Sequence, residues 1–158
     1  MTINIRQYTH HDAHHLRQLF FHTVRQVNAK DYTLAQLEAW APDEYDQSTW
    51  AQHMANLQPF IAEIDGKIVG YADLQPDGLI DHFFCHYQYQ GCGIGRALMQ
   101  SIVARAEQQH IHTLYSHVSQ TAKPFFEHFG FETQQEQSVA LRGQQLRNFK
   151  MTLNLSGN

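Results

Sequence analysis

The pattern of apolar and polar positions predicts a strand followed by helices at the start of the chain. Residues 3–8 alternate between the two kinds, as a half-buried strand does. From residue 12 to about residue 27, apolar side chains recur every three to four positions, which favours an amphipathic helix with Asp12 as its N-cap. Residues 33–40, with Thr33 as N-cap, and residues 48–57 favour two shorter helices.

The middle of the chain alternates strand and helix signals. Two apolar runs, residues 60–64 and 68–74, are separated by Asp65-Gly66 and predict a β-hairpin. Residues 79–87 (LIDHFFCHY) are rich in β-branched and aromatic side chains and predict a buried strand. After a glycine-rich loop, residues 94–109 space their apolar side chains for one buried helical face.

The last part of the chain adds a strand, a short helix and a hairpin. These are residues 113–118, residues 122–128, and the pair 131–139 and 146–155. The strand, long helix and strand in the middle imply one right-handed parallel crossover inside an otherwise antiparallel sheet. At 158 residues, we expect a single domain, 1–158.

Composition and charge exclude several classes of function. The apolar fraction of 42% and the charged fraction of 16% are typical of a globular protein. Because 11 Lys and Arg face 15 Asp and Glu without a basic cluster, nucleic acid is a poor candidate partner. There is no apolar run near the roughly 18 residues of a membrane span and no secretory signal pattern, so no membrane partner and a cytoplasmic location are expected.

Cysteine and histidine usage predicts neither a disulfide framework nor a metal site. Cys85 and Cys92 lie seven residues apart without a CxxC pair, so both are expected to be free thiols. The 12 histidines include no HExxH pattern and fit solvated faces better than a metal centre. No metal is therefore expected.

The glycine loop between residues 89 and 97 (YQGCGIGRA) carries the strongest chemical signal. Glycines allow close backbone approach to a ligand, and the free N–H groups of a helix start favour an anion such as a phosphate. A dinucleotide fingerprint would need glycine where Arg96 stands, and the P-loop GKS or GKT is absent. Gln90, Gly93 and Gly95 instead meet the pattern Q/RxxGxG/A. The alternative is a tight connection without a ligand.

Two segments resemble the GNAT (GCN5-related N-acetyltransferase) superfamily. Residues 80–99 (IDHFFCHYQYQGCGIGRALM) are similar to its strand and pyrophosphate loop, and residues 119–131 (SQTAKPFFEHFGF) to its short helix and GF turn. Residues 31–42 (DYTLAQLEAWAP) resemble the acceptor-side helix of a bacterial small-molecule branch. The resemblance spans nearly the whole chain. It implies the α/β GNAT fold, a mostly antiparallel twisted sheet of about seven strands that splays after residues 79–87, with about four helices.

The resemblance also implies acetyl-CoA as cofactor and transfer of its acetyl group to the amine of a small molecule or a protein. Family members often form dimers, so a homodimer is among the implied partners. The pantetheine arm would pair with the backbone of residues 83–85, and the amides of residues 91–95 would hold the pyrophosphate. The implied cofactor-binding residues are Phe83, Phe84, Cys85, Gln90, Gly91, Cys92, Gly93, Ile94, Gly95, Arg96, Ala97 and Phe126.

The chemistry requires a base, because an alkylamine has a pKa near 10.4 and is charged at neutral pH. The candidate is Asp81, in an apolar strand where many family members carry glutamate, and burial there would raise its pKa. The alternative is that Asp81 faces solvent. By strand alternation, His82 and His86 lie on the opposite face from Asp81 and cannot share its site. A backbone N–H near Cys85 would stabilise the oxyanion, and Cys85 itself is expected to be buried and inert.

The general acid is open, since Phe126 stands where the family usually has tyrosine. Either the thiolate leaves without a side-chain acid, or Tyr115 or His117 on the following strand supplies the proton. A third alternative is a sensor module that binds acyl-CoA with weak or no transfer. Aromatic side chains of Phe21, Tyr32 and Trp40 are candidates for the wall of the acceptor pocket.

Overall fold

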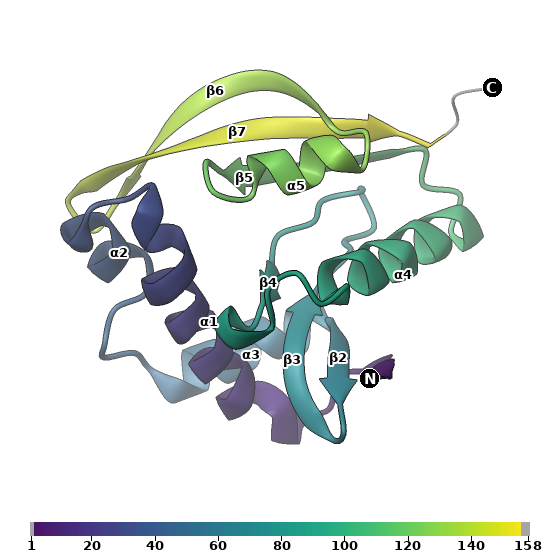
Figure 1. The fold of residues 1–158 in the computed structure, drawn as a ribbon, viewed down its shortest axis with the longest axis horizontal. Helices are drawn as coiled ribbons and strands as arrows, with labels where there is room; N and C mark the ends of the chain where they lie inside the picture. Colours follow the sequence, from purple (N-terminus) through teal and green to yellow (C-terminus); the bar gives the residue numbers. More distant parts are fainter. Residues whose placement is uncertain (1, 156–158) are drawn as a thin grey trace.

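The computed structural model describes residues 2–155 and arranges seven strands in two antiparallel sheets, with five α-helices around them (Figure 1). The first sheet contains, in spatial order, β1 (Ile3–Gln7), β2 (Phe60–Ile64), β3 (Lys67–Ala72) and β4 (Phe83–Cys85). The second contains β5 (Thr113–Ser119), β7 (Gln144–Asn154) and β6 (Glu132–Leu141). The helices are α1 (Ala13–Val27), α2 (Leu34–Trp40), α3 (Gln47–Leu57), α4 (Ile94–Gln108) and α5 (Lys123–His128).

The two sheets meet at one short parallel contact between residues 78–80 and Tyr115. Leu79 and Tyr115 form a parallel bridge, Ile80 donates its N–H to the Tyr115 carbonyl (2.8 Å), and Tyr115 donates to the Gly78 carbonyl (3.0 Å). The expected fold class is confirmed. The predicted parallel pairing on either side of α4 is present only as this bridge. The strands therefore form two antiparallel sheets instead of the predicted single mixed sheet. There are five α-helices among the described residues, where about four were predicted.

The predicted strand at residues 79–87 is too long, since β4 covers only Phe83–Cys85. The reason is a buried carboxylate. Asp73, directly after β3, accepts the N–H groups of Asp81 (2.8 Å) and His82 (2.7 Å) on one oxygen, which pulls this segment out of regular strand geometry. Strand alternation therefore does not govern residues 81 and 82.

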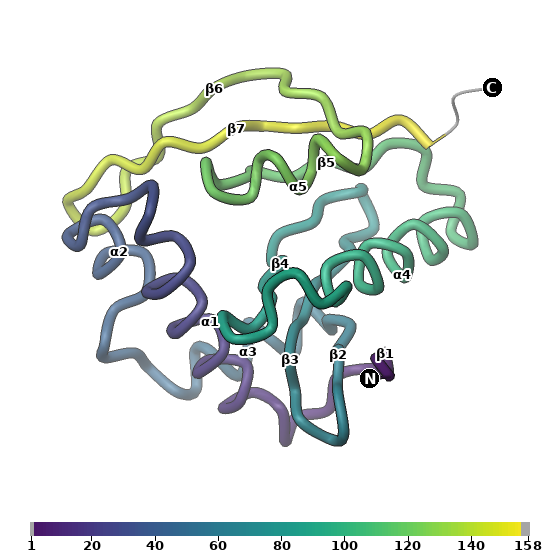
Figure 2. Tube along the Cα trace, in the orientation of Figure 1, coloured from purple at the N-terminus to yellow at the C-terminus, as the bar shows by residue number. Residues whose placement is uncertain are grey.

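Both faces of the first sheet are covered, α1 lying on one side and α4 on the other (Figure 2). Alternation along β2 assigns its side chains to two cores. Ile61 packs with Leu16 of α1, whereas Ala62 packs with Leu98 of α4. Leu16 and Leu98 are fully buried, and each such burial contributes about 2 kcal/mol. Sequence periodicity thus placed α1 and α4 correctly.

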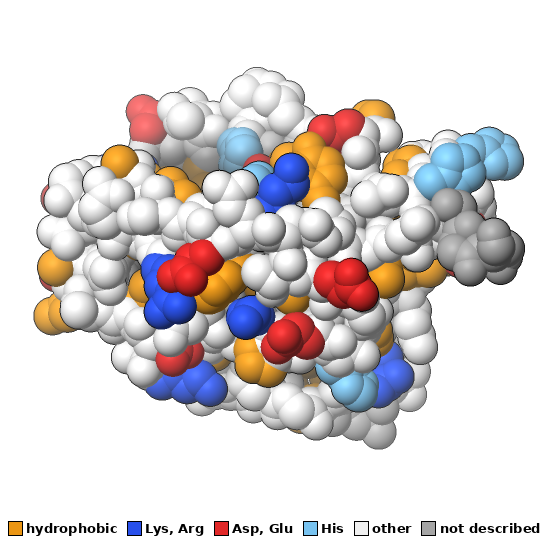
Figure 3. Space-filling view, turned by 90° about the horizontal axis from the view of Figure 1, so that it is seen from above, with side chains coloured by type: hydrophobic (Ala, Val, Ile, Leu, Met, Phe, Trp, Pro, Cys, Tyr) orange, Lys and Arg blue, Asp and Glu red, His pale blue; other side chains and the backbone are white. Residues whose placement is uncertain are grey.

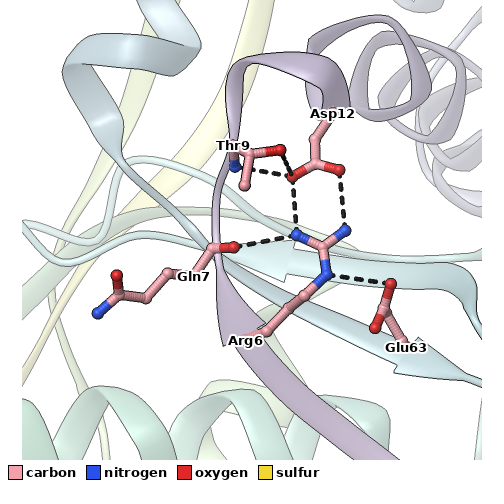
Figure 4. A network of polar contacts seen from close by, with 5 residues as sticks. All are labelled: Arg6, Gln7, Thr9, Asp12 and Glu63. Atoms are coloured by element: carbon pink, nitrogen blue, oxygen red, sulfur yellow. Dashed lines mark hydrogen bonds and ion pairs between the residues drawn. The ribbon is translucent and has the colours of Figure 1, made fainter.

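Asp12 is the N-cap residue of α1, as predicted, but its side chain makes no capping hydrogen bond and belongs to an ion-pair network (Figure 4). Both Asp12 carboxylate oxygens accept from the Arg6 guanidinium at 2.8 Å, and Thr9 donates its N–H to the same carboxylate at 2.8 Å. Arg6 also pairs with Glu63 at 3.0 Å. The Arg6 bond holds the pKa of Asp12 below its usual value. The network joins three elements, since Arg6 lies in β1, Glu63 lies in β2, and Asp12 ends the 3-10 turn that leads into α1.

Two other local predictions are confirmed. Thr33 accepts the Gln36 N–H as the cap of α2. Asp65 and Gly66 have φ of 50° and 77°, as the predicted hairpin turn requires. Within residues 2–155, none of the helices combines the length and apolar character needed to cross a membrane. Seen from above β6 and β7, acidic and basic side chains are interspersed over the surface (Figure 3).

Candidate active site

A cleft of about 800 Å³ lies where β4 and β5 diverge beyond their junction. Side chains from α1, α3, β4, β5, α5 and the β6–β7 hairpin form its wall. The predicted site residues that line it are Asp81, Phe83, Phe84, Cys85, Gln90, His117 and Phe126. A smaller cleft of about 480 Å³ beside the Arg6–Asp12 network contains none of the predicted site residues. The larger cleft is therefore the candidate active site.

The edge of β4 presents backbone donors to this cleft. His86 donates its N–H to a β3 carbonyl (2.8 Å), and the His82 carbonyl accepts from the residue that follows β3 (3.2 Å). Since both backbone groups of a strand residue point to one side and sides alternate, even-numbered residues face β3. The N–H groups of Phe83 and Cys85 consequently point away from β3, towards the gap between the sheets.

The Cys85 carbonyl confirms this direction. It accepts from Thr23 Oγ1 of α1 (3.0 Å) and from Gln90 Nε2 (2.9 Å), and not from β3. The Gln90 amide also reaches the His86 carbonyl (3.2 Å), so its side chain fastens the end of β4. Thr23 thereby joins α1 to the same strand edge.

The loop before α4 leaves N–H groups of the helix start without partners inside the helix. Gly91 and Gly93 have φ of 74° and 87°, a region that is costly for residues with a side chain. The helical pattern begins with the bond from Ala97 N–H to the Gly93 carbonyl (3.1 Å), and no side chain caps the helix. Residues 94–96 therefore offer three donors at the positive end of the helix dipole, which suits a pyrophosphate.

Gly95 also allows α4 and α5 to pack closely. A Cβ at this position would lie 2.7 Å from the Phe125 ring, closer than atoms can approach. The Ile94 side chain is buried in the core, so only its backbone can contact a ligand. Residues 91–97 do not line the cleft itself, and their contact with the cofactor stays a prediction.

One buried hydroxyl on the cleft wall has no partner. Thr121 Oγ1, between β5 and α5, makes no hydrogen bond to any described residue. Leaving such a group buried and unpaired costs about 1 to 3 kcal/mol. A cleft with this hydroxyl and the free N–H groups of Phe83 and Cys85 fits a ligand that carries amide groups, as the pantetheine arm of acetyl-CoA does.

Histidine and tyrosine side chains form a hydrogen-bonded chain that reaches the cleft through His82 and His53. His82 Nδ1 lies 2.9 Å from the hydroxyl of Tyr71, and His82 Nε2 lies 3.2 Å from His53 Nε2 of α3. Tyr71 is fully buried, and burial raises the pKa of its phenol well above its usual value. Burial also lowers the pKa of His82 to about 4, so its imidazole is neutral at physiological pH.

This chain determines which nitrogen of His82 carries the proton. The buried Tyr71 hydroxyl must donate, and its partner is His82 Nδ1. His82 Nε2 then carries hydrogen and donates to His53 Nε2. Three ligand-type atoms of His53, Asp81 and His82 lie within 4.8 Å of one another, but a metal ion would need both Nε2 lone pairs and would leave the Tyr71 proton unpaired.

Asp81 lies beside this chain and faces solvent, so its predicted burial is wrong. Its side chain is 42% exposed, and its carboxylate lies 3.8 Å from His53 Nε2. The buried acid of this region is Asp73, whose pKa burial raises to about 6. Asp73 does not line the cleft and acts by holding the backbone of residues 81 and 82. The expectation that His82 and Asp81 cannot share a site is also wrong.

The two candidates for the general acid differ in position. Tyr115 donates its hydroxyl to Asp77 (2.6 Å), which raises the pKa of the phenol, and it does not line the cleft. His117 does line the cleft, and Gln137 Nε2 lies 3.0 Å from its Nδ1. Phe126 lines the cleft but is buried and bears no exchangeable proton.

Cys85 is unsuited to nucleophilic attack. Burial raises the pKa of its thiol to about 12, so the thiolate is absent at neutral pH. Both cysteines are free, as expected. Of the aromatic residues expected on the acceptor side, Tyr32 and Trp40 line the cleft. Phe21 does not, and it packs instead against the Arg25 guanidinium at 4.5 Å.

Residues that sequence reasoning missed include Arg17, His53 and Thr121 on the cleft wall and Asp73 behind it. The acid among them had a signal, because Asp73 follows the apolar run IVGYA and an acid next to a buried strand needs a partner. The other three lie on helices or turns with unremarkable local patterns.

Known proteins resemble this chain over its full architecture. The chain matches the acetyltransferase (GNAT) domain family over residues 28–155. It is 33% identical over 149 residues to the uncharacterised N-acetyltransferase YafP of Escherichia coli (strain K12), covering 94% of each chain.

Solved structures show the same fold. A GCN5-related N-acetyltransferase from Rhodopseudomonas palustris superposes with a TM-score of 0.93 at 31% identity, covering 98% of this chain and 97% of the other. YncA from Salmonella typhimurium, solved with acetyl-CoA, has a TM-score of 0.71 at 18% identity, covering 100% and 96%. Given the cleft, the free strand edge and these similarities, the chain belongs to the GNAT family and is an acetyl-CoA-dependent acyltransferase.

Proposed function

We propose that the enzyme transfers the acetyl group to the amine of a small molecule held between α1, α3 and β4. The observation that carries this proposal is the proton-accepting pair Asp81 and His53 on the wall of an aromatic-lined cleft that also receives the free β4 edge. Aromatic walls and a few polar groups suit a small organic ligand better than a flat protein surface. A protein amino group is the nearest alternative acceptor, and a sensor without transfer is the other.

Acetyl-CoA supplies an activated thioester, and the protein's own groups provide the rest. The donors of the β4 edge and of the α4 start hold the cofactor, with Thr121 Oγ1 as a further donor. The Cys85 N–H is the group that polarises the acetyl carbonyl. No side chain of the described residues is needed as a covalent nucleophile, since Cys85 is protonated.

The acceptor amine must lose a proton, and the chain of Tyr71, His82 and His53 defines where it goes. His82 Nε2 carries hydrogen and cannot accept another at that atom. The acceptors that remain are the Asp81 carboxylate and, when the amine replaces the His82 contact, His53 Nε2. We assign the base role to Asp81 with His53 beside it. Of the acid candidates, His117 is the one on the cleft wall, and departure of the thiolate without a side-chain acid is the alternative.

Two further parts of the proposal concern the molecule's setting. Cys85 and Cys92 are free thiols, which fits the reducing cytoplasm. A single acetyltransferase domain over residues 1–158 fits the 94% coverage of the curated relative. A homodimer stays a proposal that sedimentation of the purified protein would test.

The test is acetyl-CoA-dependent release of thiol over a panel of small amines and peptides, with Asp81→Asn as the decisive variant. We expect kcat to fall by about 100-fold, the usual contribution of a general base, while calorimetric acetyl-CoA affinity stays unchanged. Asp77→Asn is the matched control, because Asp77 lies in the preceding loop and bonds Tyr115 outside the cleft. Full turnover by Asp81→Asn would remove Asp81 from the mechanism. Tight acetyl-CoA binding with no acceptor in the panel would favour the sensor.

A further inference from the structure

Arg17 of α1 is a buried cation on the cleft wall without an acidic partner. Its residue exposure is 6%, and it lines the cleft. Its guanidinium donates to the Pro42 carbonyl at 2.6 Å, and no carboxylate of the described residues lies within ion-pair distance. A buried charge is costly unless it is paired, so this arrangement indicates an absent counter-charge.

Other arginines of the described chain show the usual solution. Arg6 pairs with Asp12 and Glu63. Arg25, two turns further along α1, donates to the Ala41 carbonyl (2.9 Å) and pairs with Asp43 (3.0 Å). Arg17 and Arg25 thus bond neighbouring carbonyls in the same way, and only Arg25 has its own acid. The difference is that Arg17 faces the cleft and Arg25 does not.

Aromatic rings hold the Arg17 guanidinium in a defined orientation. Its central carbon lies 4.2 Å from the Tyr45 ring centroid and 5.3 Å from those of both Phe20 and Trp50. The rings pack around the guanidinium, so a hydrogen-bonding partner must approach the N–H groups at the edge of its plane. Two of these N–H groups together match the two oxygens of a carboxylate. The fixed rings also reduce the entropy lost when a ligand binds.

The same rings lie near both Arg17 and the cluster of His53, Asp81 and His82. The centroids of the Phe20 and Trp50 rings lie 6.0 Å and 6.1 Å from that of the His82 ring. An anion on Arg17 and an amine at Asp81 and His53 would therefore lie within one compact ligand that packs on these two rings. Arg142 also lines the cleft, and its positive charge acts on Arg17.

Burial of Arg17 disfavours its charged form, which also favours the binding of an anion. Burial lowers the pKa of Arg17 from its usual value, Tyr45 and Tyr71 oppose this in part, and the charges of Arg142 and Arg25 lower it further. An arginine stays charged even so. A ligand carboxylate would relieve this repulsion.

From these observations we propose that the acceptor is an amine that also bears a carboxylate, such as a free amino acid, and that Arg17 binds the carboxylate. This inference rests on the proposed transfer to a small-molecule amine and names its substrate class. Arg17 is accordingly a specificity-determining residue, separate from the proton-accepting pair.

The first experiment compares acceptors that differ only in the anion. Purified enzyme and acetyl-CoA are assayed with L-methionine, L-phenylalanine and L-glutamine, each beside its carboxamide, and with phosphoethanolamine and spermidine. The amides are less basic and so more often neutral, which biases the assay towards them. We expect the acids to exceed the amides in kcat/KM by about 30-fold, the range of a charge-assisted hydrogen bond. Equal use of amides, or preference for phosphoethanolamine or spermidine, would overturn the carboxylate assignment.

The second experiment separates Arg17 from the fold. In Arg17→Gln we expect kcat/KM for the acids to fall by about 30-fold and that for the amides to change by less than about 3-fold. Arg25→Gln is the matched control, since it loses the same kind of carbonyl bond and stacking outside the cleft. If Arg17→Gln does not fold, Arg17→Lys keeps the charge without the planar fork and should recover part of the acid preference. An equal loss for acids and amides would mean that Arg17 is only structural.

An equilibrium measurement distinguishes failure of this inference from failure of the proposed function. N-acetyl-L-methionine and its carboxamide are titrated into the enzyme in the presence of CoA. Tighter binding of the acid, lost in Arg17→Gln, supports the anion site even where no amine is turned over. If amines are acetylated but the two compounds bind equally, the function stands and the anion site does not.

Discussion

The two halves of the cleft are built from different kinds of groups. On the proposed cofactor side, the donors are backbone N–H groups of β4, and the α4 start outside the cleft lining adds further N–H groups at a loop with glycines at positions 91, 93 and 95. On the acceptor side, the groups are side chains that come from separate segments, among them Arg17 of α1 and His53 of α3. Backbone donors do not depend on side-chain identity, whereas each group of the proposed acceptor side can be removed by one substitution.

This difference has a consequence for which changes are tolerated. A backbone donor survives most substitutions unless the new side chain alters the chain path, so the cofactor side is sensitive mainly at glycines. A side-chain site loses its function with a single conservative change, such as aspartate to asparagine. The halves are joined by the Thr23 bond to the Cys85 carbonyl, which keeps α1 at a fixed distance from the strand edge.

The largest effect is expected for a substitution of Gly95, at the α4 start on the proposed cofactor side. In Gly95→Glu, the new side chain meets the Phe125 ring, and its carboxylate repels an anion at the α4 start. We expect acetyl-CoA affinity to fall by about 100-fold or more, equivalent to about 2.7 kcal/mol, in calorimetric titration. Gly143→Asp adds the same charge in the open β6–β7 turn and should leave the affinity unchanged. Unaltered binding by Gly95→Glu would place the phosphates elsewhere.

An effect of intermediate size is expected in the pH dependence of stability, through Asp73 and His82 near the proposed acceptor site. Asp73 has a pKa raised to about 6, so the folded state binds its proton more readily than the unfolded state, and its contribution to stability declines as pH rises from about 4 to about 6. His82 has a pKa lowered to about 4 from an ordinary value of 6.5, so its contribution declines as pH falls through the same range. The two opposing slopes cancel in part in the parent protein.

Variants should separate these slopes in urea unfolding at pH 4.5 and pH 7. Relative to the parent, Asp73→Asn should gain stability at pH 7 over pH 4.5, and His82→Gln should show the opposite trend, each by about 1 to 3 kcal/mol. Asparagine keeps the oxygen that accepts the Asp81 and His82 N–H groups, so the local backbone is retained. Parallel curves for parent and variants would show that neither group titrates in this range.

The smallest expected effect concerns Thr121, the unpaired hydroxyl on the cofactor side. Thr121→Val removes a buried group without a partner, so the free protein should gain about 0.5 to 1 kcal/mol. The affinity for acetyl-CoA should fall by roughly 3- to 10-fold if the hydroxyl serves the cofactor. Thermal unfolding with and without acetyl-CoA measures both changes, and Thr133→Val on exposed β6 is the control. A variant that binds acetyl-CoA as tightly as the parent would assign Thr121 no role in binding.

Local patterns predicted most of the elements because each depends on neighbours in the chain. The hairpin turn at Asp65-Gly66 and the Thr33 cap need only adjacent residues, and both are confirmed. The length of β4 could not be predicted, because Asp73 takes the N–H groups of residues eight and nine positions away. Asp12 is the N-cap residue of α1 as predicted, but the use of its carboxylate could not be predicted, because Arg6 from β1 reaches it in place of the helix N–H groups.

The sequence by itself determined the fold class and the glycine loop on which the proposed cofactor side rests, since backbone donors follow from turn and helix signals that are local. Only the tertiary structure brought together the side chains of the proposed acceptor side. His53 and His82 are 29 residues apart in sequence and 3.2 Å apart in space, and neither has a local signal. In the sequence, Arg17 has the pattern of an ordinary surface residue of an amphipathic helix. The packing of α1 against Tyr45 and Trp50 is what buries its charge beside the cleft. Burial and proximity are properties of the packed chain, and they assign these side chains their chemistry.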